Sequence, residues 1–363
     1  MYFTYPQFKN FNLRPLFRGF SEIGLRNGLA KIFPGFNIVF TDSGRSAFQI
    51  AIRELKLENS EMIVPAYLCD IFLPIFEKYN IKPIYLDIDL KTFHAKLSEI
   101  EEKLTPKTKS ILICHTYGLP FEMDKILETA KRHNLKIIED CAHISPSTSP
   151  EKFGDFVFFS FAKICPNING GMLISKARIN AEISAYQPKL SNIVKFLRLF
   201  PVLANVSEKF RKEKPQLTEK FSEPKKASKL SLKLFNNYLE DFEQQTEKRI
   251  DLAKYFQKKL QEIGFEIQET KNNTFIYLSA LIPKNINRDE LFDKLRKYNI
   301  FCSRIWRKPI YPNLPNTQET AKRIINFPLQ DWFTEKDIDK IFEIIKTLFL
   351  ETNQDNSSQN SLK

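Results

Sequence analysis

Short apolar runs alternate with amphipathic stretches over the first half of the chain. Runs short enough for strands lie at 37–41, 61–67, 82–88, 109–118, 136–141, 156–161 and 170–175. Stretches with apolar residues at helical spacing lie at 46–57, 71–80, 97–104 and 123–134. Such alternation is typical of α/β proteins. It predicts a mostly parallel central sheet that is flanked by helices on both faces.

The alternation ends after about residue 178, where the chain becomes basic and irregular. A long helix is predicted next, followed by two short strands, a helix, a loop and a last helix, which together indicate a smaller α+β C-terminal domain. The pattern therefore divides the chain into an N-terminal arm (1–35), a large α/β domain (36–178), a basic irregular and amphipathic insertion (179–235), a small α+β domain (236–350) and a polar tail expected to be disordered (351–363).

The chain carries a formal net charge of +12, and part of the excess is concentrated. Nine lysines and arginines lie between residues 209 and 233. Positive charge attracts nucleic acids, anionic membranes and anionic small molecules, but a solvated basic loop is the simplest interpretation. No nucleic-acid-binding motif accompanies the charge, so we expect no nucleic-acid partner.

Apolar residues also recur at helical spacing between 191 and 210, next to basic ones. Two interpretations are open. The apolar face packs in a homodimer interface, which we favour because amphipathic faces usually pack on protein. Alternatively, the segment 191–233 makes a peripheral contact with an anionic membrane.

The five cysteines are widely spaced, and no pair has the C-x-x-C spacing of a zinc site. We expect neither a metal site nor a disulfide framework, and a reducing compartment fits best. The N-terminus lacks the basic start and apolar run of a signal peptide. No apolar stretch reaches the roughly 18 residues of a membrane-spanning helix. The sequence thus predicts a cytoplasmic protein.

Polar residues follow most of the predicted strands, at the sheet edge where parallel α/β proteins bind ligands. The first group, Ser43-Gly44-Arg45-Ser46, lies in a turn that opens a helix. Free backbone N–H groups at a helix start bind phosphate, and an arginine adds charge-assisted hydrogen bonds. The alternative is an ordinary helix cap made by Ser46 or Asp42.

Three further residues offer complementary chemistry. Asp140 ends an apolar strand, where its carboxylate suits the protonated nitrogen of a pyridine ring, or simply faces solvent. His143 follows and can hydrogen-bond an oxygen on the same ring, or be structural. Lys163 lies between two core strands, where a deprotonated lysine can form an imine with a carbonyl, or be a surface lysine.

The order of these groups along the chain resembles the DegT/DnrJ/StrS sugar aminotransferases. The resemblance covers about 38–175 and resumes near 247–262 and 294–345. It is carried by the order and spacing of SGRSA (43–47), VPAY (64–67), DID (87–89), HTYGLP (115–120), EDCAH (139–143), FSFAK (159–163) and GGML (170–173). It implies the fold-type I aminotransferase architecture, with 36–178 as the cofactor-binding domain.

The resemblance also implies roles. The cofactor is pyridoxal 5'-phosphate, with its phosphate held by Gly44, Arg45, Ser46 and Ser160, its ring nitrogen by Asp140 and its ring oxygen by His143. Lys163 is the catalytic residue that binds the cofactor covalently and then moves protons. Tyr67 lies in the segment that covers the ring, although the usual stacking position falls on Cys69. The implied partners are an amino donor such as glutamate, a nucleotide-linked keto-sugar and a second copy of the chain.

Three features depart from the family pattern. Ser160 and Lys163 are three residues apart instead of five, and Ile164-Cys165-Pro166-Asn167 replaces a glycine-rich stretch. An Asn-Tyr-Arg motif that reaches across the dimer in the family is not recognisable, and ungapped counting places Pro224-Lys225-Lys226 there. These features motivate an alternative hypothesis, in which the chain is a scaffold or binding protein of the same fold that has lost transamination.

Overall fold

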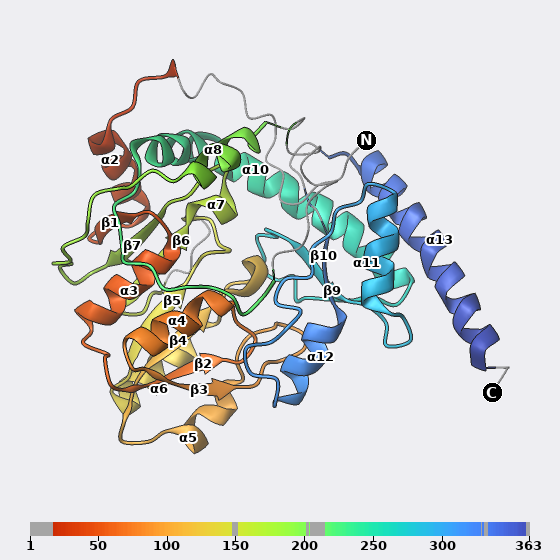
Figure 1. Ribbon diagram of the computed structural model, residues 1–363, viewed down its shortest axis with the longest axis horizontal. Coiled ribbons are helices and arrows are strands. Elements are labelled where there is room, and N and C mark those ends of the chain that lie inside the picture. The colour runs from red at the N-terminus through yellow and green to blue at the C-terminus, as the bar shows by residue number, and fades with distance from the viewer. Residues whose placement is uncertain are drawn as a thin grey trace.

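The computed structural model describes residues 17–146, 152–200, 203, 215–327, 329 and 333–360, with side chains described up to residue 351. Figure 1 shows a large α/β region joined by the long helix α10 (Lys229–Glu262) to a smaller region that contains α11 (Arg288–Lys297) and α13 (Glu335–Asn360). Among the described residues, no helix is both long and apolar enough to cross a membrane.

The large region is built on a seven-stranded sheet of order β1-β7-β6-β5-β4-β2-β3. Its strands are β1 (Asn37–Thr41), β2 (Glu61–Pro65), β3 (Lys82–Leu86), β4 (Thr108–Cys114), β5 (Lys136–Asp140), β6 (Phe156–Ser160) and β7 (Gly171–Ser175). All seven predicted strands are present, and β7 is the strand of this sheet that runs in the opposite direction to the other six. The mostly parallel sheet predicted from the alternation is confirmed.

Helices cover both faces of this sheet, and two separate apolar clusters mark the two faces. One cluster joins the sheet to α3 (Gly44–Glu54) and α4 (Leu73–Lys78). The other joins it to α2 (Glu22–Ile32) and to the first half of α10. The remaining helical segments of this region are η1 (Asp70–Phe72), η2 (Leu97–Glu99), α5 (Ile100–Lys103), η3 (Thr116–Gly118), α6 (Met123–His133), α7 (Phe161–Ile164) and α8 (Leu190–Leu197).

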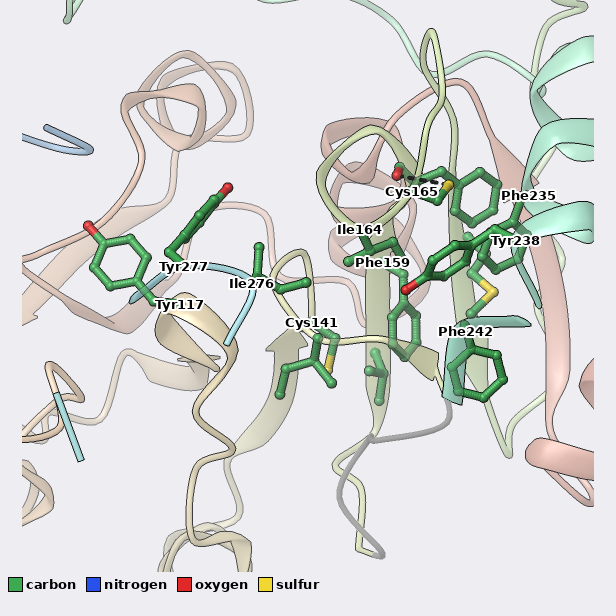
Figure 2. Packing of buried hydrophobic residues seen from close by; sticks show 14 of the residues in the cluster. Tyr117, Cys141, Phe159, Ile164, Cys165, Phe235, Tyr238, Phe242, Ile276 and Tyr277 are labelled. Atoms are coloured by element: carbon green, nitrogen blue, oxygen red, sulfur yellow. Dashed lines mark hydrogen bonds between the residues drawn. The ribbon is translucent and has the colours of Figure 1, made fainter. Parts of the chain in front are cut away.

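Helix α10 belongs to both cores because its two halves bury different residues. Phe235, Tyr238 and Phe242 pack on the large sheet beside Phe159 and Ile164, as Figure 2 shows. Residues 252–260 instead pack into the core of the small domain. One continuous helix therefore fixes the small domain relative to the large sheet.

The small domain has a three-stranded antiparallel sheet of order β10-β9-β8. Its strands are β8 (Glu266–Ile267), β9 (Leu278–Leu281) and β10 (Ile324–Phe327), and α12 (Pro315–Arg323) precedes β10. The predicted α+β character is confirmed, although neither α12 nor β10 was predicted. Helix α13 extends to Asn360, so most of the tail expected to be disordered continues this helix.

Hydrogen bonds hold the small domain against the edge of the large sheet where β3 and β4 end. The Asp87 carboxylate, just after β3, accepts hydrogen bonds from the Asn316 and Thr317 amides at the start of α12. Thr274 N–H donates to the Gly118 carbonyl, 2.8 Å away. These contacts bring the loop before α12 to the carboxyl edge of the large sheet, where the candidate site lies.

The amphipathic helix predicted within 191–210 begins as α8. Leu190, Ile193, Val194 and Leu197 are between 45% and 80% exposed, so the apolar face of α8 is uncovered in the single chain. Most of residues 201–214 lies outside the described residues, so the structure does not test the rest of the predicted helix. Over 215–227 the chain is described again and has no long helix or strand.

Candidate active site

The first turn of α3 forms one wall of the site. Ser43 is the N-cap, because its hydroxyl accepts the Ser46 N–H at 3.2 Å. The alternative of a helix cap made by Ser46 or Asp42 is therefore wrong. The Ser46 hydroxyl instead donates a hydrogen bond to the Asp42 carboxylate at 2.5 Å. The amides of Gly44 and Arg45, in the first turn, have no intrahelical acceptor and remain suited to an anion.

The backbones around Gly44, Phe159 and Gly171 pack so closely here that a Cβ atom at Gly171 would clash. A Cβ atom at Gly171 would lie 2.6 Å from the Phe159 carbonyl and 2.7 Å from the Gly44 nitrogen. A Cβ atom at Gly44 would lie 3.3 Å from the Ser160 Cβ. Ser160, at the end of β6, thus lies beside the amides of α3. No hydrogen-bond partner for its hydroxyl is recorded among the described residues, which leaves this group available to a ligand.

The guanidinium of Arg45 is engaged elsewhere. It lies 3.2 Å from the Glu219 carboxylate and 3.3 Å from the Lys220 carbonyl, on the segment 215–227. The resemblance implies a phosphate contact for Arg45, and in this structure its side chain instead contacts the segment 215–227.

Asp140 ends β5 at the centre of the carboxyl edge of the sheet. Its Oδ1 accepts the Ala142 N–H at 2.8 Å. Burial raises its pKa to about 6, although the Ala142 hydrogen bond and the charges of His115 and Lys163 act in the opposite direction. A carboxylate with few donors around it is strongly stabilised by any cation or N–H that enters the site.

His143 is held as a neutral hydrogen-bond donor. The Tyr117 N–H donates to its Nδ1 at 3.3 Å, which leaves the ring hydrogen on Nε2. Burial, with the charge of Lys163 in addition, holds its pKa well below the usual range. His143 therefore presents a neutral N–H group on the same side of the sheet as Asp140.

Lys163 lies in α7, a single turn directly after β6. Its charge acts on Asp140, His143 and Cys69, which places it within electrostatic reach of all three. Its side chain is exposed in the single chain, and no ion-pair partner for it is recorded among the described residues. The structure thus brings together Lys163, Asp140 and His143, which are separated by up to 23 residues in the sequence.

Tyr67 lies in the interior of the protein. It is fully buried, and its hydroxyl lies 2.7 Å from the Tyr117 hydroxyl and 2.9 Å from the Ile305 carbonyl. Burial also raises its pKa. The residue of this segment that is half-buried and feels the charge of Lys163 is Cys69. The Tyr67 side chain therefore packs in the interior and bonds the Tyr117 hydroxyl and the Ile305 carbonyl.

A buried pair beneath Asp140 had no predicted role. His115 Nε2 lies 3.0 Å from the Glu139 carboxylate, and its Nδ1 accepts the Phe121 N–H at 2.9 Å. Both residues appear in the sequence among the polar groups that follow strands, but nothing in their spacing shows that they bond each other. The pair fixes the ends of β4 and β5 and thereby the position of Asp140.

Comparisons with known proteins agree with this geometry. The sequence matches the DegT/DnrJ/EryC1/StrS aminotransferase family model over residues 29–346. GDP-perosamine synthase of Escherichia coli O157:H7 is 36% identical over 140 residues, which are 37% of this chain and only 38% of that protein. The dTDP-4-amino-4,6-dideoxy-D-glucose transaminase of Shigella dysenteriae is 27% identical over 252 residues, 66% of this chain and 62% of that protein.

Solved structures show the same fold. DesV of S. venezuelae matches with a TM-score of 0.71 at 18% identity, covering 92% of this chain and 90% of that chain. A GDP-4-keto-6-deoxymannose-3-dehydratase with a trapped PLP–glutamate adduct matches with a TM-score of 0.70 at 20% identity, covering 90% and 92%. These likenesses show the fold-type I aminotransferase architecture, and the match over residues 29–346 means that the chain belongs to the DegT/DnrJ/EryC1/StrS aminotransferase family.

Proposed function

We propose that the protein is a pyridoxal-phosphate-dependent aminotransferase that moves an amino group from an amino acid, such as glutamate, to a nucleotide-linked keto-sugar in surface-polysaccharide biosynthesis. The observation that carries this proposal is the meeting of Asp140, His143 and Lys163 beside the first turn of α3. The relatives named above are a perosamine synthase and an amino-sugar transaminase, which supports the same substrate class.

The described residues fit this cofactor. The amides of Gly44 and Arg45 and the Ser160 hydroxyl suit its phosphate. Asp140 would accept the ring N–H, and His143 Nε2 would donate to the ring oxygen. The cofactor supplies an electron sink for the carbon that carries the amino group. Lys163 Nζ would bind the cofactor and then carry protons to and from that carbon, a role that its reach toward Asp140 and His143 supports.

The alternative of an inactive scaffold rested on the unrecognisable Asn-Tyr-Arg motif and on the altered segment between Ser160 and Asn167. That segment is accommodated by α7, whose Phe161 ring stacks on Phe235 of α10 with centroids 3.9 Å apart. The turn is thus anchored against the core while Lys163 stays near Asp140. This geometry favours the enzyme over the scaffold.

A half-reaction tests the proposal. Purified protein loaded with pyridoxal phosphate is mixed with glutamate, and we expect stoichiometric formation of 2-oxoglutarate together with loss of the cofactor's visible absorption near roughly 420 nm. Adding a nucleotide-linked keto-sugar should restore the absorption and yield an amino-sugar. A protein that binds the cofactor yet forms no 2-oxoglutarate with any amino acid would support the scaffold.

We further infer that the protein acts as a cytoplasmic homodimer in which a second copy covers α8. The exposed apolar face of α8 supports a protein partner. Asn192 of α8 and Asn169 of the loop that follows Lys163 both donate to the Tyr186 hydroxyl, so a partner on α8 would lie close to the site. The five free cysteines support a reducing compartment.

Replacing Ile193 by glutamate should convert the dimer to monomer, because burial of an unpaired charge in an apolar interface is costly. Light scattering after size exclusion measures this change. Leu350→Glu is the matched control, since Leu350 is also an exposed aliphatic residue but lies on α13. A monomeric wild-type protein that floats with anionic vesicles, and loses flotation in Ile193→Glu, would instead place 191–233 on a membrane.

A further inference from the structure

Trp306 brings an aromatic ring from the small domain to the candidate site. Its ring stacks on Tyr117, with centroids 5.4 Å apart and planes 24° apart, and meets Tyr67 edge-on at 5.1 Å. It also lies 5.7 Å from the His143 ring at 30°. The indole is 9% exposed, so a small part of it remains uncovered.

Cys69, in the segment after β2, packs against the apolar cluster that contains the same indole. Burial raises the pKa of the half-buried Cys69 thiol, and the charge of Lys163 acts in the opposite direction. Trp306 therefore lies beside His143, and Cys69 packs on the same cluster. The thiol is too small to cover an aromatic ring, whereas the indole beside it is large and flat.

The loop that carries Trp306 is held in an unusual conformation. Trp306 has a φ of 57°, in the left-handed region that bulky residues rarely adopt. The preceding carbonyl, of Ile305, lies within hydrogen-bond distance of the Tyr67 and Tyr117 hydroxyls, and the Ile305 N–H donates to Asn326 on β10. Strained conformations persist only where the surroundings fix them, and they concentrate at functional sites.

We propose that Trp306 is a cofactor-contacting residue, whose indole forms the aromatic wall of the ring pocket between Cys69 and His143. This inference rests on the proposed function and extends it. The small domain, and not the segment after β2, would supply the aromatic side chain that contacts the cofactor ring. This role also gives a reason for the strain: the backbone at Trp306 aims the indole at the site.

The test compares pyridoxal-phosphate affinity in folded variants. Trp306→Leu should weaken binding roughly tenfold, because the variant would lose an aromatic stacking contact with the cofactor ring. Adding Cys69→Phe to that variant should recover binding to within about threefold, since the new ring would lie beside the same pocket. The matched control is Phe93→Leu, because Phe93 packs on Tyr67 and Tyr117 in the same cluster, 6.3 and 6.1 Å away. It should lower thermal stability while leaving affinity unchanged.

A second variant covers the case in which Trp306→Leu does not fold. Trp306→Phe keeps an aromatic ring and should bind the cofactor, but the circular dichroism of the visible cofactor band should change. An unchanged band in folded Trp306→Phe, or equal weakening by Trp306→Leu and Phe93→Leu without rescue, would overturn the inference alone. Wild-type protein that binds no pyridoxal phosphate would overturn the proposed function as well.

Discussion

Lys163→Ala is expected to abolish amino transfer, lowering kcat by roughly 10³-fold or more, because it removes both the amine that holds the cofactor and the group that moves protons. The variant should still bind pyridoxal phosphate through the phosphate cradle and Asp140. Borohydride reduction followed by peptide mass spectrometry measures the difference. The wild-type protein should carry the reduced cofactor on the peptide that contains Lys163, and the variant should carry none.

Lys176→Ala is the matched control for this experiment. Lys176 is also an exposed lysine close to a strand end, after β7, but it lies over the Phe36 ring. Its replacement should leave both kcat and the labelled peptide unchanged. Label on a different lysine of the wild-type protein, or full activity of Lys163→Ala, would remove Lys163 from the mechanism.

The large domain was predictable because its signals are local. Each strand from β1 to β7 is a short apolar run, and each major helix between them has apolar residues at helical spacing. The antiparallel direction of β7 was not predictable, since a buried strand reads the same in either direction. Helix α12 was missed because its signal is distant: Asp87, 229 residues before Asn316, accepts the amides of its first turn.

The part of the candidate site that lies at strand ends was predictable for the same reason. Asp140, His143 and Lys163 each stand at a strand end, so the parallel sheet itself brings them together. Arg45 was placed by its position at a helix start and Tyr67 by resemblance. Their partners, Glu219 and the Ile305 carbonyl, come from segments far along the chain. Trp306 carried no signal, because neither its left-handed backbone nor its contact with His143 is encoded in a local pattern.

Asp140→Asn is expected to lower kcat and to raise the stability of the cofactor-free protein. The variant keeps an oxygen that can accept the Ala142 N–H but loses the negative charge that would pair with the cofactor ring. We expect kcat to fall roughly 10²–10³-fold, as when a single electrostatic contact to a reacting group is removed. At the same time the cofactor-free variant should be more stable than the wild-type protein at about pH 8, by roughly 1–3 kcal/mol.

The gain in stability follows from the burial of the charge. Burial raises the pKa of Asp140 from 3.8 to about 6, so between these values the folded chain binds more protons than the unfolded chain. Ionised Asp140 therefore destabilises the folded chain fully above about pH 6, and this cost disappears as the pH falls toward about 4. The difference in unfolding free energy between variant and wild type, measured by urea denaturation, should shrink over that range.

Cofactor binding should show the opposite dependence on pH. A ring N–H binds the ionised carboxylate, so wild-type affinity for pyridoxal phosphate should be full above about pH 6 and should decline as Asp140 becomes protonated below it. Asp140→Asn should lack this decline. If the variant were no more stable than the wild type at about pH 8, and its affinity changed with pH in the same way, Asp140 would be a solvated strand-end acid. Burial would then not destabilise the ionised carboxylate of Asp140, and this carboxylate would not bind the ring nitrogen of the cofactor.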